Sequence, residues 1–328
     1  MKKMSLVAVM AASALALSAC GGNGELKKTA IKVGNVTVTA GDVAVMAQTQ
    51  MSYGATDFDS AMMDLAEDIK TSFEYGELGK AMKLELTDED KQQAIATRAQ
   101  YASSAGGYET YSKYLKENGS DIEFLDELFT ASLYMSKVQD KVTEELKDKE
   151  VTDDELKKFY DENYLCAKHI LVNKPAEGEE PAEGEKQGEE LAKELLERAK
   201  NGEDFDAMIK EYSQDPGSES NPNGYVFTDG EMVKSFEDGV KSIKSGEFTL
   251  VESDYGYHVI LRLDLPAFED NKDKVSTTYE SKRIENRVEE LLKENGIEST
   301  MDEDAIKAVK QDMIGEAPKS QSNTSMSY

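Results

Sequence analysis

Residues 165–172 read Leu-Cys-Ala-Lys-His-Ile-Leu-Val and residues 257–263 read Tyr-His-Val-Ile-Leu-Arg-Leu, and these two stretches decide the fold of the chain's centre. Both are short apolar runs, which is typical of buried β-strands. Residues 248–251 give a third strand candidate. The sequence contains two histidines, His169 and His258, one in each quoted stretch. Because the first and last strands of one small sheet can be neighbours, the two imidazoles are candidates for a shared site.

Two helices are expected between the first strand and the other two. Apolar residues recur at helical spacing in both, and Asn201-Gly202 ends the first helix. These residues are Leu191, Leu195, Leu196 and Ala199, then Phe205, Met208, Ile209 and Tyr212. Residues 174–190 are rich in glutamate and contain prolines and glycines, so we expect a mobile loop there. A turn-rich segment occupies residues 215–230. The centre therefore reads as a β-α-α-β-β unit.

Helical sequence flanks this unit on both sides. Residues 42–147 are mostly helical in pattern, after a hairpin signal at Gly34-Asn35. Thr87 to Asp90 and Thr152 to Glu155 both fit a capping box. After Pro266 an apolar stripe recurs: Ile284, Val288, Leu291 and Leu292. A lone helix cannot bury such a stripe, so we expect it to pack on the N-terminal helices. The fold class is then α+β, with the central unit inserted in a mainly α-helical domain.

The N-terminus indicates export. Lys2 and Lys3 precede an apolar stretch from Leu6 to Leu17 that is too short to span a bilayer, which is typical of a secretory signal peptide. Leu17-Ser18-Ala19-Cys20 resembles the lipobox of bacterial lipoproteins, in which the cysteine receives lipid. We therefore expect a cell-membrane lipoprotein, attached through Cys20 and lying on the extracytoplasmic face.

The charge excludes one class of partner. The formal net charge is −28, and removal of the signal peptide with its two lysines makes it −30. Such acidity argues against binding to nucleic acid.

Apart from Cys20, the sequence contains one cysteine, Cys166, so no disulfide is expected. Cys166 lies three residues before His169, which places it on the opposite face of the strand. We expect it to be a buried small side chain. Asp215 and the two histidines could ligate a metal, but no local spacing supports a metal site.

The motifs of the central unit resemble those of parvulin-type peptidyl-prolyl isomerases. They occur in the same order over about a hundred residues, and they are the stretches 167–172, 201–205, 211–218, 230–237, 246–248 and 255–260. The lipobox and the helical flanks further resemble the PrsA-type foldase lipoproteins of Gram-positive bacteria. The resemblance implies a small antiparallel sheet with flanking helices, an isomerase (rotamase) activity and no cofactor.

The resemblance also implies roles for particular residues. His169 and His258 would be the paired histidines at the floor of the site, and Asp215 stands where parvulins place a cysteine or an aspartate. Ser253 lies near the position of the hydroxyl that binds the histidine pair. Three residues would line the pocket for the proline ring: Met232, Phe236 and Phe227.

The sequence departs from the parvulin pattern at two places. Many parvulins carry Gly-Gly-Asp-Leu-Gly before the pocket, whereas this chain has the shorter Asn223-Gly224-Tyr225-Val226-Phe227. Parvulins specific for phosphoserine-proline use a basic loop after the first strand, but the corresponding loop here is rich in glutamate and would repel phosphate.

The expected division of the chain follows from these patterns. It consists of a signal peptide (1–19), a lipidated tether (20–28), the N-terminal part of a helical chaperone-like domain (29–160), a parvulin domain (164–264), a C-terminal helical part that packs on the N-terminal part (266–313) and a disordered tail (314–328).

Two functions compete at this stage. The first is a foldase that isomerises X-Pro bonds in exported, unfolded polypeptides and has chaperone activity in its helical domain. The second is a holdase chaperone whose parvulin domain is weakly active or inactive. The presence of all the expected site residues favours the first, and a purely structural surface lipoprotein would leave the ordered motifs unexplained.

Overall fold

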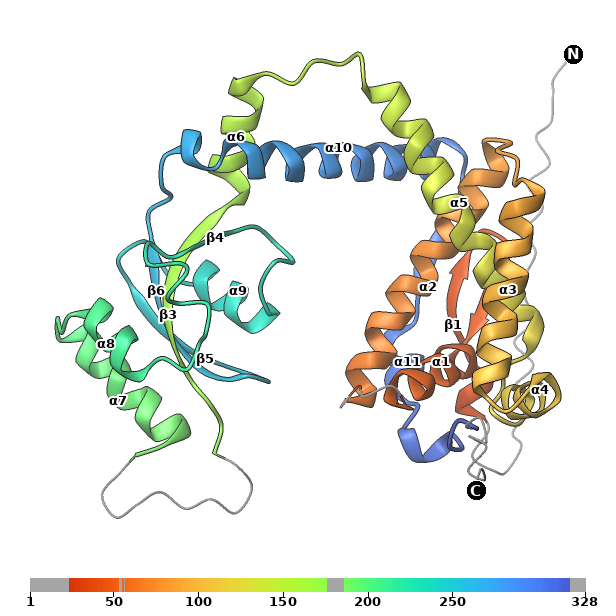
Figure 1. Ribbon diagram of the computed structural model, residues 1–328, viewed down its shortest axis with the longest axis horizontal. Coiled ribbons are helices and arrows are strands. Elements are labelled where there is room, and N and C mark those ends of the chain that lie inside the picture. The colour runs from red at the N-terminus through yellow and green to blue at the C-terminus, as the bar shows by residue number, and fades with distance from the viewer. Residues whose placement is uncertain (1–23, 53–54, 56, 176–185, 319–328) are drawn as a thin grey trace, which may run out of the picture. The chain divides into compact units, whose positions relative to one another are not determined.

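The computed structural model describes residues 24–52, 55, 57–175 and 186–318 (Figure 1). The chain divides into two compact units. Unit 1 combines residues up to Asp148 with residues from Ile284 onward, and unit 2 is the continuous segment Lys149–Arg283. The expected signal peptide, the lipidated Cys20 and most of the glutamate-rich loop lie outside the described residues.

Unit 1 contains a three-stranded antiparallel sheet built from both ends of the chain. Its strands are β1 (Thr29–Val33), β2 (Val36–Thr39) and β7 (Ser299–Met301), in the order β2-β1-β7. The turn between β1 and β2 contains Gly34 at φ +55°, so the predicted hairpin is confirmed. Strand β7 was not predicted, because three residues carry too little pattern to indicate a strand.

The other elements of unit 1 are helices, some of which contact this sheet and some of which pack on other helices. They are α1 (Ala40–Ser52), α2 (Phe58–Ala81), α3 (Asp88–Ser104), α4 (Tyr108–Glu117), α5 (Ile122–Leu146) and α11 (Glu303–Lys307), with short 3₁₀ turns at Glu25–Lys27 and Gln311–Met313. Thr87 forms the predicted capping box with Asp90 at the start of α3. Leu26 and Ile314 are buried in the core of this unit. The described parts of the expected tether and tail are therefore packed rather than extended.

Helix α10 (Lys272–Glu294) carries the predicted apolar stripe. Val288 and Leu291 are buried in a cluster with side chains of α2 and α5, and Ile284 and Leu292 pack against the same cluster. The partners on α2 and α5 include Tyr75, Leu78, Val138, Val142 and Leu146. The expectation that the C-terminal helix packs on the N-terminal helices is thus confirmed for residues 284–292.

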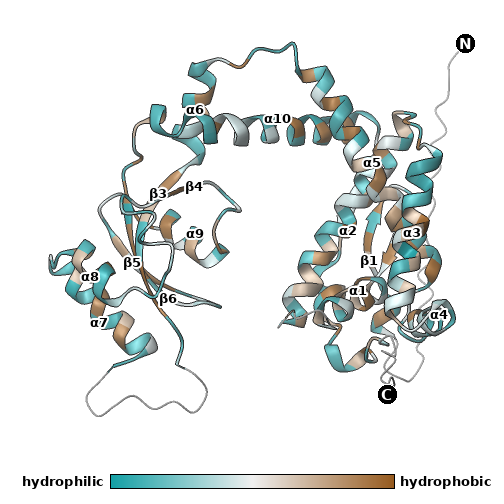
Figure 2. Ribbon diagram, in the orientation of Figure 1, coloured by the Kyte–Doolittle hydropathy of each residue, from teal (hydrophilic) through white to brown (hydrophobic). Residues whose placement is uncertain are grey.

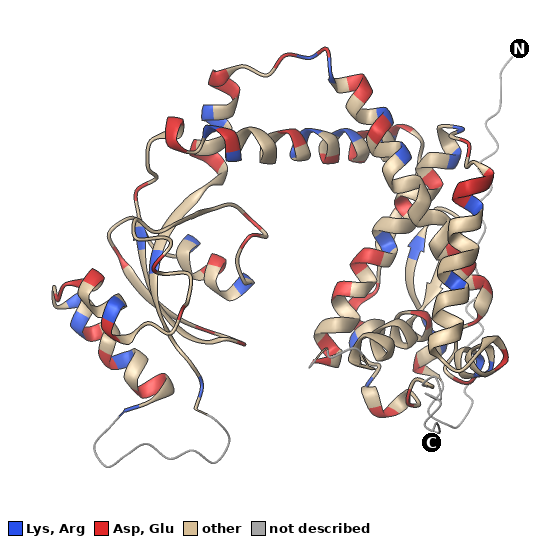
Figure 3. Cartoon of the chain, viewed as in Figure 1, with Lys and Arg blue, Asp and Glu red and all other residues tan. Residues whose placement is uncertain are grey.

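Unit 2 is built on a four-stranded antiparallel sheet with the order β4-β3-β6-β5. The strands are β3 (Leu165–Val172), β4 (Tyr225–Phe227), β5 (Phe248–Ser253) and β6 (Gly256–Leu263). Helices α7 (Gly188–Lys200) and α8 (Phe205–Tyr212) bury their apolar sides against one face of the sheet, and α9 (Lys234–Lys241) covers the other (Figure 1). The strands are largely apolar, whereas hydrophilic and charged residues concentrate on helices and loops (Figures 2 and 3).

The α+β class, the predicted strands and both predicted helices are confirmed, but β4 and α9 were not predicted. Both lie in or beside the turn-rich segment. Strand β4 has three residues and α9 has eight, with Gly239 near its middle. Gly239 is required by packing, because a Cβ there would lie 2.6 Å from Cγ1 of Val251. Neither element is long enough to show a period in the sequence.

The boundaries of unit 2 also differ from the expected range 164–264. Helix α6 (Asp153–Asn163), which begins at the predicted Thr152 capping box, packs here rather than in the helical domain. Its Tyr160 is buried in one cluster with Tyr164, Phe268 and Val275. Residues 149–163 and 266–283 therefore close one side of unit 2. Among all described helices, none combines the length and apolar character needed to cross a membrane.

Candidate functional site

The register of the sheet brings the two histidines together. Strands β3 and β6 are antiparallel neighbours, as expected, and pair His169 with Ile260 and Leu171 with His258. Directly opposed residues share a face, and residues two apart along a strand share it too. His169 and His258 are therefore diagonal neighbours on one face, with ring centroids 5.2 Å apart.

Asp215 reaches the same face from the loop after α8. Its Oδ2 lies 3.4 Å from Nε2 of His169. The loop is attached to β3 at Leu171, whose backbone N–H donates to Oγ of Ser213 at 3.2 Å and whose carbonyl accepts from the Gln214 N–H at 2.8 Å. These bonds hold the start of the loop against β3 and so fix the backbone position of Asp215.

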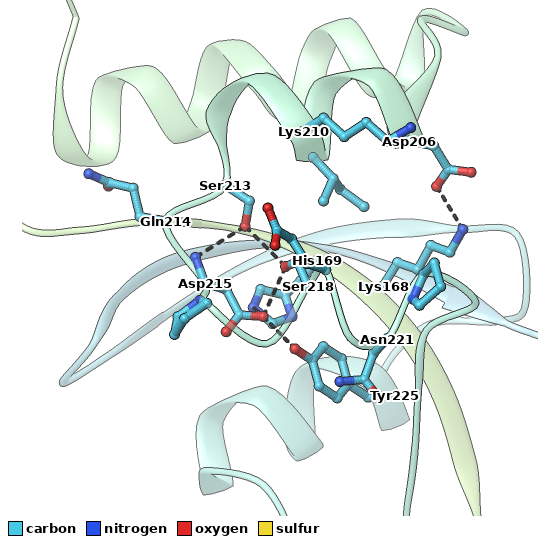
Figure 4. Close-up of a pocket in the computed structure, with 14 residues that line it drawn as sticks. Lys168, His169, Asp206, Lys210, Ser213, Gln214, Asp215, Ser218, Asn221 and Tyr225 are labelled. Atoms are coloured by element: carbon cyan, nitrogen blue, oxygen red, sulfur yellow. Dashed lines mark hydrogen bonds and ion pairs between the residues drawn. The ribbon is translucent and has the colours of Figure 1, made fainter.

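Three donors hold the Asp215 carboxylate. The Tyr225 hydroxyl donates to Oδ2 at 2.6 Å, and the Ser218 hydroxyl donates to Oδ2 at 2.9 Å (Figure 4). The Gly217 N–H donates to Oδ1 at 3.0 Å. Burial alone would raise the pKa of Asp215, but these hydrogen bonds, with Tyr225 first among them, outweigh burial and lower it. The carboxylate is therefore ionised at neutral pH.

Both histidines are neutral at the same pH. Burial lowers the pKa of His169, although the nearby Asp215 charge opposes the shift. Burial, followed by the His169 charge, lowers the pKa of His258 to about 4. The 3.4 Å approach of His169 and Asp215 is then a contact between a neutral ring and a carboxylate rather than an ion pair. The hydroxyl oxygen of Ser253, at the end of β5, lies 2.7 Å from Nε2 of His258.

An apolar cluster lies against the imidazoles. The Phe236 ring meets His169 and His258 edge-on, at centroid distances of 5.1 and 5.6 Å, and Phe227 is 5.8 Å from Phe236. Met232 packs on this cluster and is partly exposed. Phe236 is only 2% exposed, which differs from our expectation of an open pocket wall, since α9 presses its ring onto the sheet. The buried Glu237 carboxylate accepts from the backbone N–H groups of Gly230 and Met232 and so shapes this loop.

A cavity of about 750 Å³ opens beside His169 and Asp215. Its walls come from β3, α8 and the loop 213–225, and they include Lys168, Ile209 and Tyr225 (Figure 4). The ammonium group of Lys168 is paired with Asp206 at 2.7 Å. The polar side of the site therefore faces a space large enough for a segment of peptide.

The structure brings all four predicted polar residues together, beside the three predicted apolar ones. Sequence reasoning missed Tyr225, because its bond to Asp215 depends on the unpredicted strand β4. Cys166 is buried on the opposite face from His169, as predicted. Burial also raises the pKa of its thiol. In the part of the chain that the structure describes, no group of three or more His, Cys, Asp or Glu residues could hold a metal ion.

Comparison with known proteins finds relatives that match most of this chain. The family model described as the PPIC-type PPIase domain matches residues 154–264. Foldase protein PrsA of Geobacillus kaustophilus is 31% identical over 313 residues, which cover 91% of this chain and 94% of that protein. Foldase protein PrsA 3 of Bacillus cereus is 28% identical over 293 residues, covering 87% and 86% of the two chains. A crystal structure of peptidylprolyl isomerase (PrsA) from Bacillus cereus is 24% identical and covers 86% of this chain and 96% of that one, with a TM-score of 0.31.

Proposed function

The chain belongs to the PrsA foldase family and carries a parvulin-type peptidyl-prolyl isomerase domain, and from this premise we propose that it isomerises X-Pro bonds in exported polypeptides outside the cytoplasm. We further propose that it is anchored in the cell membrane by lipid on Cys20 and that its helical unit acts as a chaperone. Unfolded or newly exported chains that contain proline are its substrates in this proposal.

The observation that carries the proposed mechanism is the joint position of His169, His258 and Asp215 beside Phe236. Rotation about an X-Pro bond removes amide resonance, and breaking that resonance in an ordinary peptide costs roughly 18–20 kcal/mol. No covalent bond has to break, so the site must stabilise the twisted amide better than the planar one. In this proposal the proline ring packs at Met232, the partly exposed member of the apolar cluster with the buried Phe227 and Phe236, and the polar groups face its carbonyl.

The charge state of the polar groups suits this task. Twisting returns electron density from the carbonyl oxygen to the proline nitrogen. A fixed carboxylate beside two neutral imidazoles supplies a polar environment that needs no rearrangement during the rotation. The Ser253 hydroxyl contacts Nε2 of His258, and the Asp215 carboxylate contacts Nε2 of His169. These contacts give both rings defined positions.

A protease-coupled assay on short proline peptides tests this assignment in the full chain. We expect Asp215→Ala and His258→Ala to lower kcat/KM by at least tenfold, while Lys200→Ala, on the exposed end of α7, leaves it unchanged. Wild-type kcat/KM in both site variants would contradict the proposed roles. The competing holdase function predicts a different result: kcat/KM is already low in the wild type, while the wild type and these variants suppress aggregation of a client protein equally.

Lipid attachment has its own test. Cells that express the wild type and Cys20→Ser are labelled with a radioactive fatty acid, and the labelled proteins are compared after membrane fractionation. We expect label and membrane association for the wild type alone. Equal labelling of the serine variant would contradict the anchor, without bearing on the isomerase site.

A further inference from the structure

Tyr225 lies in the site, but the mechanism proposed above gives it no role. It begins β4, which pairs with β3 through Ala167 opposite Tyr225. Directly opposed residues share a face of the sheet, and so do Ala167 and His169. Tyr225 therefore lies on the face of the paired histidines, and its ring stacks on His169 at a centroid distance of 5.6 Å and an interplanar angle of 27°.

The phenol also bonds the carboxylate that lies next to the same histidine. Its hydroxyl donates to Oδ2 of Asp215 at 2.6 Å, and this is the oxygen that lies 3.4 Å from Nε2 of His169. One side chain thus contacts both members of the pair, the imidazole through its ring face and the carboxylate through its hydroxyl. Burial, followed by the hydrogen bond to Asp215, raises the pKa of Tyr225 to about 12, so the hydroxyl keeps its proton and remains a donor at neutral pH.

The backbone makes room for this contact at Gly217. A Cβ at position 217 would lie 2.3 Å from the Tyr225 hydroxyl oxygen, far inside van der Waals contact. Gly217 does not have a positive φ, so its conformation alone does not demand glycine. The absence of a side chain at 217 is what allows the phenol to reach the carboxylate.

We propose that Tyr225 is a positioning residue of the isomerase, which holds the Asp215 carboxylate in place against His169 through its hydroxyl. This inference rests on the proposed role of the His169–Asp215 pair. Ser218 and Gly217 also bind the carboxylate, Ser218 through its hydroxyl and Gly217 through its backbone N–H. Tyr225 differs from these two donors because its ring also stacks on His169, so it ties the carboxylate to the imidazole.

The test compares Tyr225→Phe with the wild type in the full chain. The phenylalanine keeps the ring that stacks on His169 and removes only the hydroxyl. A hydrogen bond to a charged group is strong enough that its loss should lower kcat about tenfold and leave KM close to wild type. The melting temperature should fall only by as much as the loss of this one bond accounts for. Tyr255→Phe is the matched control, because that hydroxyl belongs to a side chain that is 66% exposed on the β5–β6 turn.

A second readout is the titration of the Asp215 carboxyl, followed by carbon NMR. Loss of its hydrogen-bond donor should raise the Asp215 pKa in Tyr225→Phe. The other titratable groups around this carboxyl are His169 on β3, His258 on β6 and, lining the cavity, Lys168, Lys210, Asp206 and Glu219. All of them are retained in the variant, so the shift reports on the phenol. A purely structural role for Tyr225 would lower the melting temperature and raise this pKa, but it would leave kcat at the wild-type value at a pH where the carboxyl is ionised in both proteins.

Gly217→Ala gives an independent variant that keeps the hydroxyl but fills its place. We expect it to lower kcat as Tyr225→Phe does, and the double variant to be no worse than the poorer single variant. Wild-type kcat in Tyr225→Phe, together with a large loss in Asp215→Ala, would overturn this inference alone. Full activity in Asp215→Ala would overturn the proposed role of Asp215 and, with it, this inference.

Discussion

The side chain of His258 links the stability of unit 2 to pH. Its pKa in the folded protein is about 4, below the ordinary value of 6.5, because the ring is buried. Between these two pH values the unfolded chain binds more protons than the folded one, so stability falls as the pH drops from 6.5 to 4. The shift corresponds to a loss of about 3 kcal/mol at most, and above pH 6.5 this group contributes no pH dependence.

We therefore predict that His258→Asn flattens part of this dependence. Urea unfolding of unit 2 in the full chain is measured at several pH values between 4 and 7.5, for the wild type and the variant. The variant should lose less stability on acidification, whatever its stability at pH 7.5. The carboxylates titrate in both proteins, so parallel curves would show that His258 is not buried in its neutral form.

Met232 and Phe236 should respond differently to truncation, because they differ in burial. Phe236→Ala removes a ring that is 2% exposed and contacts both imidazoles, so we expect it to cost about 3–5 kcal/mol of stability and most of the activity. Met232→Ala, at a partly exposed position, should lower kcat/KM severalfold with a smaller loss of stability. Melting temperature and kcat/KM are measured on both variants. If Met232→Ala melts much earlier yet keeps full activity, the proline-pocket assignment of Met232 fails.

At the scale of elements, the position of α9 depends on a glycine. Gly239→Ala improves helix propensity by roughly 1 kcal/mol, but its Cβ would lie 2.6 Å from Cγ1 of Val251 on β5. We predict a net loss of stability and of activity, because α9 carries Phe236 against the histidines. Val251→Ala removes the obstructing atom, so the double variant should be more stable than the sum of the two single losses implies. Strict additivity in a double-mutant cycle of melting curves would contradict this packing.

The elements that could be predicted from the sequence are those with a local pattern. The strands around His169 and His258, the helices at 191–199 and 205–212 and both capping boxes depend on neighbouring residues, and all are present. Strands β4 and β7 have three residues each and exist only because a long strand elsewhere offers an edge. The placement of His169 and His258 in two apolar stretches made them candidates for one site, and the resemblance to parvulins added Asp215 and Ser253. Tyr225 could not be found, because its partner is set by the pairing of β4 with β3.

At the scale of the whole molecule, the isomerase unit extends beyond the range that its motifs suggest. Residues 164–264 lack Tyr160, Phe268 and Val275, which close one side of this unit with Tyr164. We predict that an excised 149–283 segment unfolds cooperatively and at a higher temperature than an excised 164–264 segment. Calorimetry of the two segments measures the difference. Equal melting temperatures would show that the buried cluster adds nothing to the stability of the unit.

Strand β7 and the second half of α10 come late in the sequence, and this affects how the protein folds during its synthesis. A polypeptide is synthesised from its N-terminus, and domains usually fold in that order. Here residues 24–148 emerge first but cannot finish folding, since β1 still lacks its neighbour β7 and the α2–α5 pair lacks Val288 and Leu291. The segment 149–283 emerges later yet is complete in itself. Until Ser299–Met301 is synthesised, β1 presents an unpaired edge that other nascent chains could join, so we expect this foldase to be most prone to aggregation before its own first domain is complete.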